Sequence, residues 1–132
     1  MAGGSAVTPV LDASSILAVI FEEPGADLVI AHSDGALLSA VNLDEVLHKS
    51  ARRDIAGSDV EQQLTKLGIV IVPFASADAR IAAALHPRVD RTGTSFADRA
   101  CLALGIATGG PIFTCDGKWL NLGLDLDIRL IR

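Results

Sequence analysis

The chain has 132 residues, a formal net charge of −5 and two cysteines, and 50% of its residues are hydrophobic while only 4% are aromatic. This length fits one domain with an aliphatic core, and the acidic balance excludes a protein that holds nucleic acid through bulk positive charge. The longest uncharged stretch, 100–115, is interrupted by two glycines and a proline and falls short of the roughly 20 apolar residues that a membrane helix needs, so we expect no membrane contact.

Strand-like and helix-like segments alternate along the chain. Short apolar runs predict strands, and apolar residues at helical spacing between capping and stop signals predict helices. In chain order we expect a strand at 7–11, a helix from Ser14 or Ser15 to 21, a short helix at 25–31, a strand at 36–38, helices at 40–53 and 58–67, a strand at 69–74, helices at 76–85 and 95–107, a strand at 111–114, one helical turn at 118–122 and a last strand at 128–131.

The predicted strands are continuous apolar runs rather than alternating ones. This pattern favours an α/β fold in which helices cover both faces of a parallel sheet. We expect Ser58 to cap the helix at 58–67, and His86 and Pro87 to begin a polar loop that reaches Thr94. Residues 1–6 are expected to be a flexible N-terminus of a single domain that spans residues 1–132.

Four acidic residues stand where such a fold would bring them together. Asp12 and Asp116 each end a predicted strand, while Glu45 and Asp98 lie on helices that can flank the same edge of the sheet. Carboxylates gathered in one cleft repel one another unless a divalent cation lies between them. We therefore predict a Mg²⁺ or Mn²⁺ site for phosphodiester chemistry, because such a cation lowers the pKa of a bound water.

Each acid also has a structural explanation within its own segment. These explanations are an N-cap at Asp12, an ion pair of Glu45 with Lys49, a capping box of Asp98 with Ser95, and a turn formed by Asp116 and Gly117. Asp44 is the rival of Glu45 for a place in the cleft and points about a quarter-turn away from it. No single acid decides between structure and function, but the ordered set favours function.

Four motifs surround these acids: Val10-Leu-Asp-Ala-Ser14, Ser39-Ala-Val-Asn-Leu-Asp-Glu-Val46, Ser95-Phe-Ala-Asp-Arg-Ala-Cys-Leu-Ala-Leu104 and Thr114-Cys-Asp-Gly-Lys-Trp119. With these motifs, the chain resembles the PIN-domain ribonucleases that form the toxin half of VapBC-type bacterial toxin–antitoxin pairs. The resemblance extends over nearly the whole chain, from Val10 to Ile131. The first motif alone is weak evidence, whereas the four in this order are specific.

The resemblance implies a PIN-like three-layer α/β/α sandwich with a central, mainly parallel sheet of four to five strands. It also implies hydrolysis of RNA by a metal-activated water, which leaves 5′-phosphate and 3′-hydroxyl ends. The residues it assigns are the catalytic acids Asp12, Glu45, Asp98 and Asp116, the metal ligands Asp12, Asp98 and Asp116, and two contacts to metal-bound water or phosphate, Thr114 and Ser14.

Partners follow from the resemblance and from composition. The resemblance implies a structured RNA substrate such as tRNA or rRNA and a cognate VapB-type antitoxin, and the high apolar fraction favours a homodimer. Arg91, Arg99 and Lys118 lie near the acidic motifs and are expected RNA contacts, although each can equally pair with a nearby acid. Cys101 and Cys115 have no metal-ligand spacing, which is typical of reduced thiols in a cytoplasmic protein.

Three other classes of protein share some of these features. A PIN-fold nuclease outside a toxin–antitoxin system would use the same residues. A Mg²⁺-dependent phosphatase or receiver-like domain also places an aspartate after its first strand, but it needs a second one two residues later, where Ser14 stands, and it gives Glu45 no role. A pure interaction module has no need of the four acids.

Overall fold

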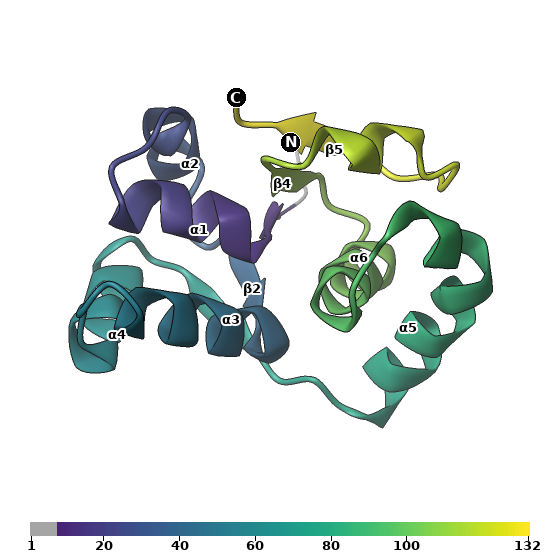
Figure 1. Ribbon diagram of the computed structural model, residues 1–132, viewed down its shortest axis with the longest axis horizontal. Helices are drawn as coiled ribbons and strands as arrows, with labels where there is room; N and C mark the ends of the chain where they lie inside the picture. Colours follow the sequence, from purple (N-terminus) through teal and green to yellow (C-terminus); the bar gives the residue numbers. More distant parts are fainter. Residues whose placement is uncertain (1–7) are drawn as a thin grey trace, which may run out of the picture.

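The computed structural model describes residues 8–132, which form a central sheet of five parallel strands (Figure 1). The strands are β1 Val10–Leu11, β2 Leu37–Ser39, β3 Val70–Val72, β4 Ile112–Thr114 and β5 Ile128–Leu130, in the order β3-β2-β1-β4-β5. The predicted parallel sheet is therefore confirmed. The expectations for residues 1–6 and for a strand beginning at Val7 lie outside the described residues.

Helices cover both faces of this sheet, as predicted. They are α1 Ala13–Ile20, α2 Ala26–Ala31, α3 Ala40–Ala51, α4 Gly57–Lys66, α5 Ser76–Val89 and α6 Phe96–Thr108, with short 3-10 helices η1 Asp90–Thr92 and η2 Gly117–Asn121. Leu11 and Phe113 pack into a core with α1 to α4, whereas Val10 and Ile112 pack into a second core with α5 and α6. Successive residues of a strand face opposite sides of the sheet, so β1 and β4 each contribute one side chain to the core on either face. The sheet and the helices on its two faces form three layers.

Helix α5 continues past the proline that was expected to end it. The prediction of a loop from Pro87 is wrong, because the helix reaches Val89 and η1 follows directly. Leu85 and Val89 lie one turn apart, and both are buried in the core beneath α5, so their burial favours continuation of the helix. Pro87 lies in the last turn, where it removes one backbone hydrogen bond.

Of the predicted helix caps, one is confirmed and another is wrong. Asp12 caps α1, as its structural explanation expected, rather than Ser14 or Ser15, because its carboxylate accepts a hydrogen bond from the Ser15 N–H at 2.9 Å. Ala56, rather than Ser58, precedes α4 and provides no side-chain hydrogen bond. In the described part of the chain, no helix is long and apolar enough to cross a membrane.

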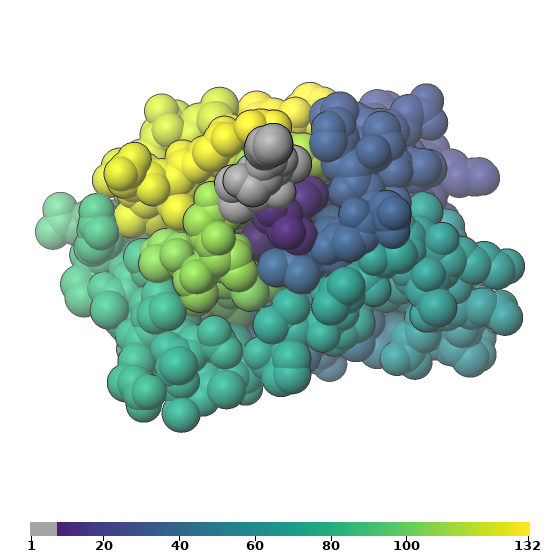
Figure 2. Space-filling model, turned by 180° about the vertical axis from the view of Figure 1, so that it is seen from behind, coloured from purple at the N-terminus to yellow at the C-terminus, as the bar shows by residue number. Residues whose placement is uncertain are grey.

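Gly25 forms a tight contact between the turn after α1 and the end of the chain. Its φ is +97°, and a Cβ built there would lie 2.6 Å from the carbonyl oxygen of Ile131. Arg132 donates a hydrogen bond to the carbonyl oxygen of Pro24 at 3.0 Å in the same place. Figure 2, seen from behind, shows the yellow C-terminal segment beside the blue segment that contains α2. Only glycine combines this backbone conformation with so close an approach.

We expect Gly25→Ala to lower the free energy of unfolding by about 2 kcal/mol or more, because a left-handed backbone and a clash with main-chain atoms combine there. Gly35→Ala is the matched control, since Gly35 has a φ of +80° and an added Cβ would meet nothing within 4 Å. In that control variant, the free energy of unfolding should fall by only about 1 kcal/mol. Urea unfolding of both variants measures the difference, and equal losses would contradict the role given to the Ile131 contact.

Candidate active site

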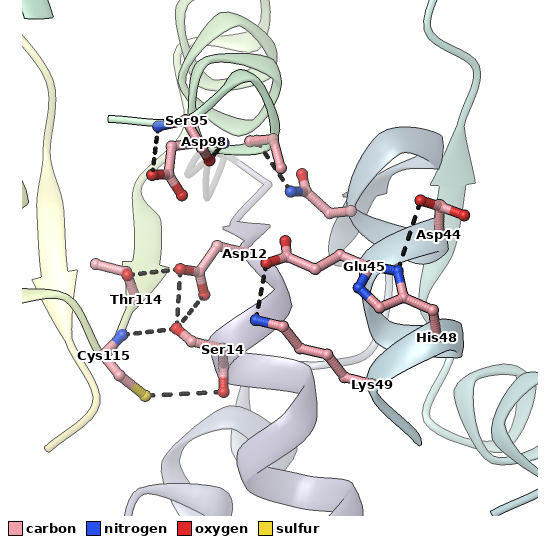
Figure 3. Close-up of polar contacts among 12 residues, drawn as sticks. Asp12, Ser14, Asp44, Glu45, His48, Lys49, Ser95, Asp98, Thr114 and Cys115 are labelled. Atoms are coloured by element: carbon pink, nitrogen blue, oxygen red, sulfur yellow. Dashed lines mark hydrogen bonds and ion pairs between the residues drawn. The ribbon is translucent and has the colours of Figure 1, made fainter. Parts of the chain in front are cut away.

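The four predicted acids line one cleft of about 200 Å³ at the carboxyl edge of the sheet. β1 and β4 are parallel neighbours and end at the same edge, so Asp12 and Asp116, which follow them, come together. Glu45 reaches the cleft from α3 and Asp98 from the first turn of α6 (Figure 3). The cleft-lining residues are Asp12, Ala13, Ser14, Leu17, Asn42, Glu45, Lys49, Asp98 and Asp116.

Asp12 is the most buried of these acids, with 6% of its surface exposed. Burial raises the pKa of its carboxyl group, and hydrogen bonds from Thr114, Ser14 and Ser15 oppose this rise. The Ser14 hydroxyl donates at 2.7 Å to Oδ1, and the Thr114 hydroxyl donates at 2.6 Å to Oδ2. Donors from α1 and β4 thus stabilise the charge of this buried carboxylate.

Thr114 connects two of the acids. It is fully buried, and its hydroxyl accepts a hydrogen bond from the Asp116 N–H at 3.0 Å while donating to Asp12. Ser14 has a similar bridging position, because its hydroxyl accepts from the Cys115 N–H at 2.9 Å. Of these two predicted water or phosphate contacts, only Ser14 lines the cleft. In the structure both hydroxyls hold Asp12 in place.

Asp98 forms the predicted capping box and also lines the cleft. Its Oδ2 accepts from the Ser95 N–H at 3.0 Å, and the Ser95 hydroxyl accepts from the Asp98 N–H at 3.1 Å, which completes the capping box of α6. The same side chain lines the cleft. Its pKa is raised, mainly by burial and further by the negative charges of Glu45 and Asp116. A capping role therefore does not remove Asp98 from the acidic cluster.

Glu45, rather than Asp44, belongs to the cleft. Its carboxylate is 3.0 Å from the Lys49 ammonium, and both side chains line the cleft. The Asp44 side chain is 84% exposed and faces His48 at 3.8 Å on the outer side of α3. The pairing with Lys49 was predicted as a structural alternative, but the presence of Lys49 inside the cleft was not. A spacing of four residues on one helix face was the signal available for it.

Asn42 also lines the cleft and was not predicted as a site residue. Only 2% of its surface is exposed, and its Nδ2 donates to the carbonyl oxygen of Ala97 at 3.0 Å. This bond joins α3 to the first turn of α6, which carries Asp98. The Asn42 Oδ1 is buried and accepts no hydrogen bond within residues 8–132. Buried acceptors without a partner are rare, and this one belongs to a residue that lines the cleft.

The three expected RNA contacts do not line the cleft. The guanidinium group of Arg99 donates to the carbonyl oxygen of Ala82 at 3.1 Å and lies 5.7 Å from the centre of the Phe96 ring, so it ties α6 to α5. Arg91 is exposed in η1, and Lys118 is exposed in η2 beside Asp116. Their contact with RNA stays a prediction.

The chemistry of the cleft suits a hard, hydrated divalent cation. Within residues 8–132, no three histidine, cysteine, aspartate or glutamate side chains stand close enough to enclose an ion by themselves. Mg²⁺ needs no such cage, because it keeps several waters and commonly binds through one or two carboxylates. The carboxylates of Asp12 and Asp98, whose pKa values are raised mainly by burial, are oxygen donors whose negative charge such an ion would offset.

Comparison with known proteins agrees with this arrangement. Residues 10–123 match the PIN domain family. No curated protein matches the chain.

Solved structures with a similar fold include a toxin–antitoxin complex from Klebsiella pneumoniae, with a TM-score of 0.74 at 15% identity over 95% of this chain and 98% of that one. VapBC2 from Rickettsia felis, bound to a DNA fragment from its promoter, has a TM-score of 0.70 at 14% identity, over 93% of this chain and 98% of that one. FitAcB from Neisseria gonorrhoeae has a TM-score of 0.67 at 20% identity, over 92% of this chain and 96% of that one. At these identities, the likeness concerns the fold.

Replacement of Asp98 by asparagine tests its place in the acidic cluster. A folded-state pKa above the reference value of 3.8 means that the ionised carboxylate opposes folding at neutral pH, and that this penalty disappears as the pH falls through the raised pKa to below 3.8. In EDTA, Asp98→Asn should therefore be at least as stable as the wild type near pH 7, and the difference should close in acid. The opposite result, a variant about 1 kcal/mol less stable at every pH, would make Asp98 a helix cap alone.

Proposed function

The chain belongs to the PIN-domain family, and we propose that it is the toxin of a type II toxin–antitoxin pair and cuts RNA by metal-dependent hydrolysis. Its substrate is a structured cytoplasmic RNA such as tRNA or rRNA, where unpaired bases can be read, and its inhibitor is a VapB-type antitoxin. The family match and the likeness to structures described as toxin–antitoxin complexes support this proposal.

One observation carries the nuclease part of the proposal. Four carboxylates from four separate segments converge on one cleft, and the pKa of Asp98 is raised in part by two of the others. Carboxylates so close together raise the cost of ionising one another, and one ammonium group, that of Lys49, lines the same cleft. A divalent cation would offset the remaining negative charge, which supports a functional reason for the cluster.

Asp12, Asp98 and Asp116 would hold a Mg²⁺ or Mn²⁺ ion, with Glu45 acting directly or through water. When bound, this cation would lower the pKa of a water molecule and offset negative charge on the phosphate. Among residues 8–132, no histidine lines the cleft, so hydrolysis depends on these acids rather than on a histidine base. The attacking water forms a bond to phosphorus as the bond to the 3′ oxygen breaks, which leaves 5′-phosphate and 3′-hydroxyl ends.

The remaining polar residues keep the acids in position. Thr114 and Ser14 hold the Asp12 carboxylate between β1 and β4 and prevent its rotation out of the cleft. Asn42 fixes the distance between the helices that carry Glu45 and Asp98, because its amide donates to the first turn of α6. Rigid support of this kind matters, because small displacements of reacting groups reduce rates strongly.

Exposed apolar side chains support the association that we propose. Val70 and Ile71 belong to the edge strand β3 and are 48% and 37% exposed, and Phe96 at the start of α6 is 50% exposed. Edge strands and apolar patches are commonly covered by another chain. A basic antitoxin segment would also find negative charge at the cleft, where an arginine or lysine would compete with the cation.

Cleavage of total bacterial RNA should require Mg²⁺ or Mn²⁺ and stop in excess EDTA. Glu45→Ala and Asp12→Ala should each reduce the rate by at least about 100-fold, because each removes a charge from the reacting centre. Asp44→Ala is the matched control for Glu45, since it removes an adjacent but outward-facing carboxylate, and it should cleave as the wild type does. Full activity in EDTA or in Glu45→Ala would overturn the metal-nuclease proposal.

Light scattering of the purified protein at micromolar concentration should give twice the chain mass of 13.7 kDa. Burial of the exposed apolar side chains provides the driving force. Co-expression with the reading frame next to its gene should yield a stable complex and relieve growth arrest. A monomer that forms no complex with any adjacent gene product would instead favour a PIN-fold nuclease outside a toxin–antitoxin system.

A further inference from the structure

An acidic cleft repels the RNA on which it acts. Each RNA phosphate is negative, the chain has a net charge of −5, and four carboxylates line the cleft. Proteins usually offset this repulsion with lysine or arginine side chains that contact phosphates. The expected contacts Arg91, Arg99 and Lys118 lie outside the cleft.

Lys49 is the one cationic side chain that lines the cleft within the described residues. We infer that Lys49 is a substrate-binding residue whose ammonium group contacts an RNA phosphate at the acidic cleft. The assignment rests on the nuclease function proposed above. Figure 3 shows the side chain directed from α3 toward Glu45 and the space beside Asp12.

The present partner of Lys49 is easily exchanged. Its Nζ lies 3.0 Å from the Glu45 carboxylate, and this is the one hydrogen bond that it donates to residues 8–132. An ammonium group has three donors, so others are available to a phosphate oxygen. The Lys49 side chain is 43% exposed and that of Glu45 24%, and a partly exposed pair four residues apart on a helix contributes little to stability. Retaining a lysine here therefore has little structural benefit.

Arg99 provides a contrast within the same region. Its guanidinium group lies against α5 and the Phe96 ring, and its Nε is buried without a partner in the described residues. It could not turn toward the cleft without losing its hydrogen bond to Ala82 of α5. Lys49 can move from Glu45 to a phosphate by rotation of its own side chain, without any movement of the backbone.

Lys49→Ala and Lys49→Arg test the assignment through cleavage of total bacterial RNA with Mg²⁺, at substrate concentrations below saturation and at several KCl concentrations. We expect Lys49→Ala to slow cleavage by about 10- to 100-fold, the loss of one charge-assisted hydrogen bond. The plot of log rate against log salt should become shallower by about 0.7, the value for one phosphate contact on a single strand. Lys49→Arg should keep most of the activity, and Lys66→Ala, on the last turn of α4, should match the wild type.

Melting temperatures without RNA separate substrate binding from a structural role. Mg²⁺ should raise the melting temperature of Lys49→Ala at least as much as that of the wild type, because loss of an ammonium group makes the cleft more attractive to a cation. Unchanged rate and salt dependence in Lys49→Ala would overturn the assignment, as would loss of the Mg²⁺ response or failure of arginine to restore cleavage. A wild-type chain that cleaves no RNA would instead overturn the nuclease proposal, and the assignment of Lys49 with it.

Discussion

Concentration of negative charge at one edge of the sheet is the constraint on which the site depends. Four carboxylates share a cleft of about 200 Å³, and the deepest of them, Asp12, is almost fully removed from water. Its pKa is raised despite hydrogen bonds from three neighbours. Because an uncompensated charge in such a place opposes folding, the protein stabilises the Asp12 carboxylate with a dense set of hydrogen-bond donors.

The fold supplies this edge through the central position of its shortest strand. β1 contributes only two residues, yet it is the central strand and pairs with β2 on one side and β4 on the other. The carboxyl end of β1 therefore lies in the middle of the sheet edge. The helix layers on the two faces meet just beyond it, where Asn42 of α3 bonds to the first turn of α6. Clefts form at such positions in parallel sheets because the connections from neighbouring strands leave to opposite faces.

Three of the four acids are also capping residues. Asp12 accepts from the Ser15 N–H at the start of α1, Asp98 from the Ser95 N–H at the start of α6, and Asp116 from the Lys118 N–H at the start of η2. A cap engages part of a carboxylate and leaves other lone pairs directed outward. The structural and functional explanations of these acids are therefore compatible. Glu45, in the middle of α3, has no capping role, and its partner within residues 8–132 is Lys49.

The sequence by itself determined the parallel α/β fold, the order of nearly all its elements and the acids that meet in the cleft. These features follow from local signals, since buried strands are apolar runs and helices repeat every 3.6 residues. Tertiary packing decided what those signals could not. Because Leu85 and Val89 are buried in the core, α5 continues past Pro87. Because Arg99 donates a hydrogen bond to α5, its side chain lies outside the cleft. The same packing brought Asn42 and Lys49 into the cleft. Which side chains face one another across two helices depends on how those helices pack, and a pattern read along a single helix contains no information about its partner.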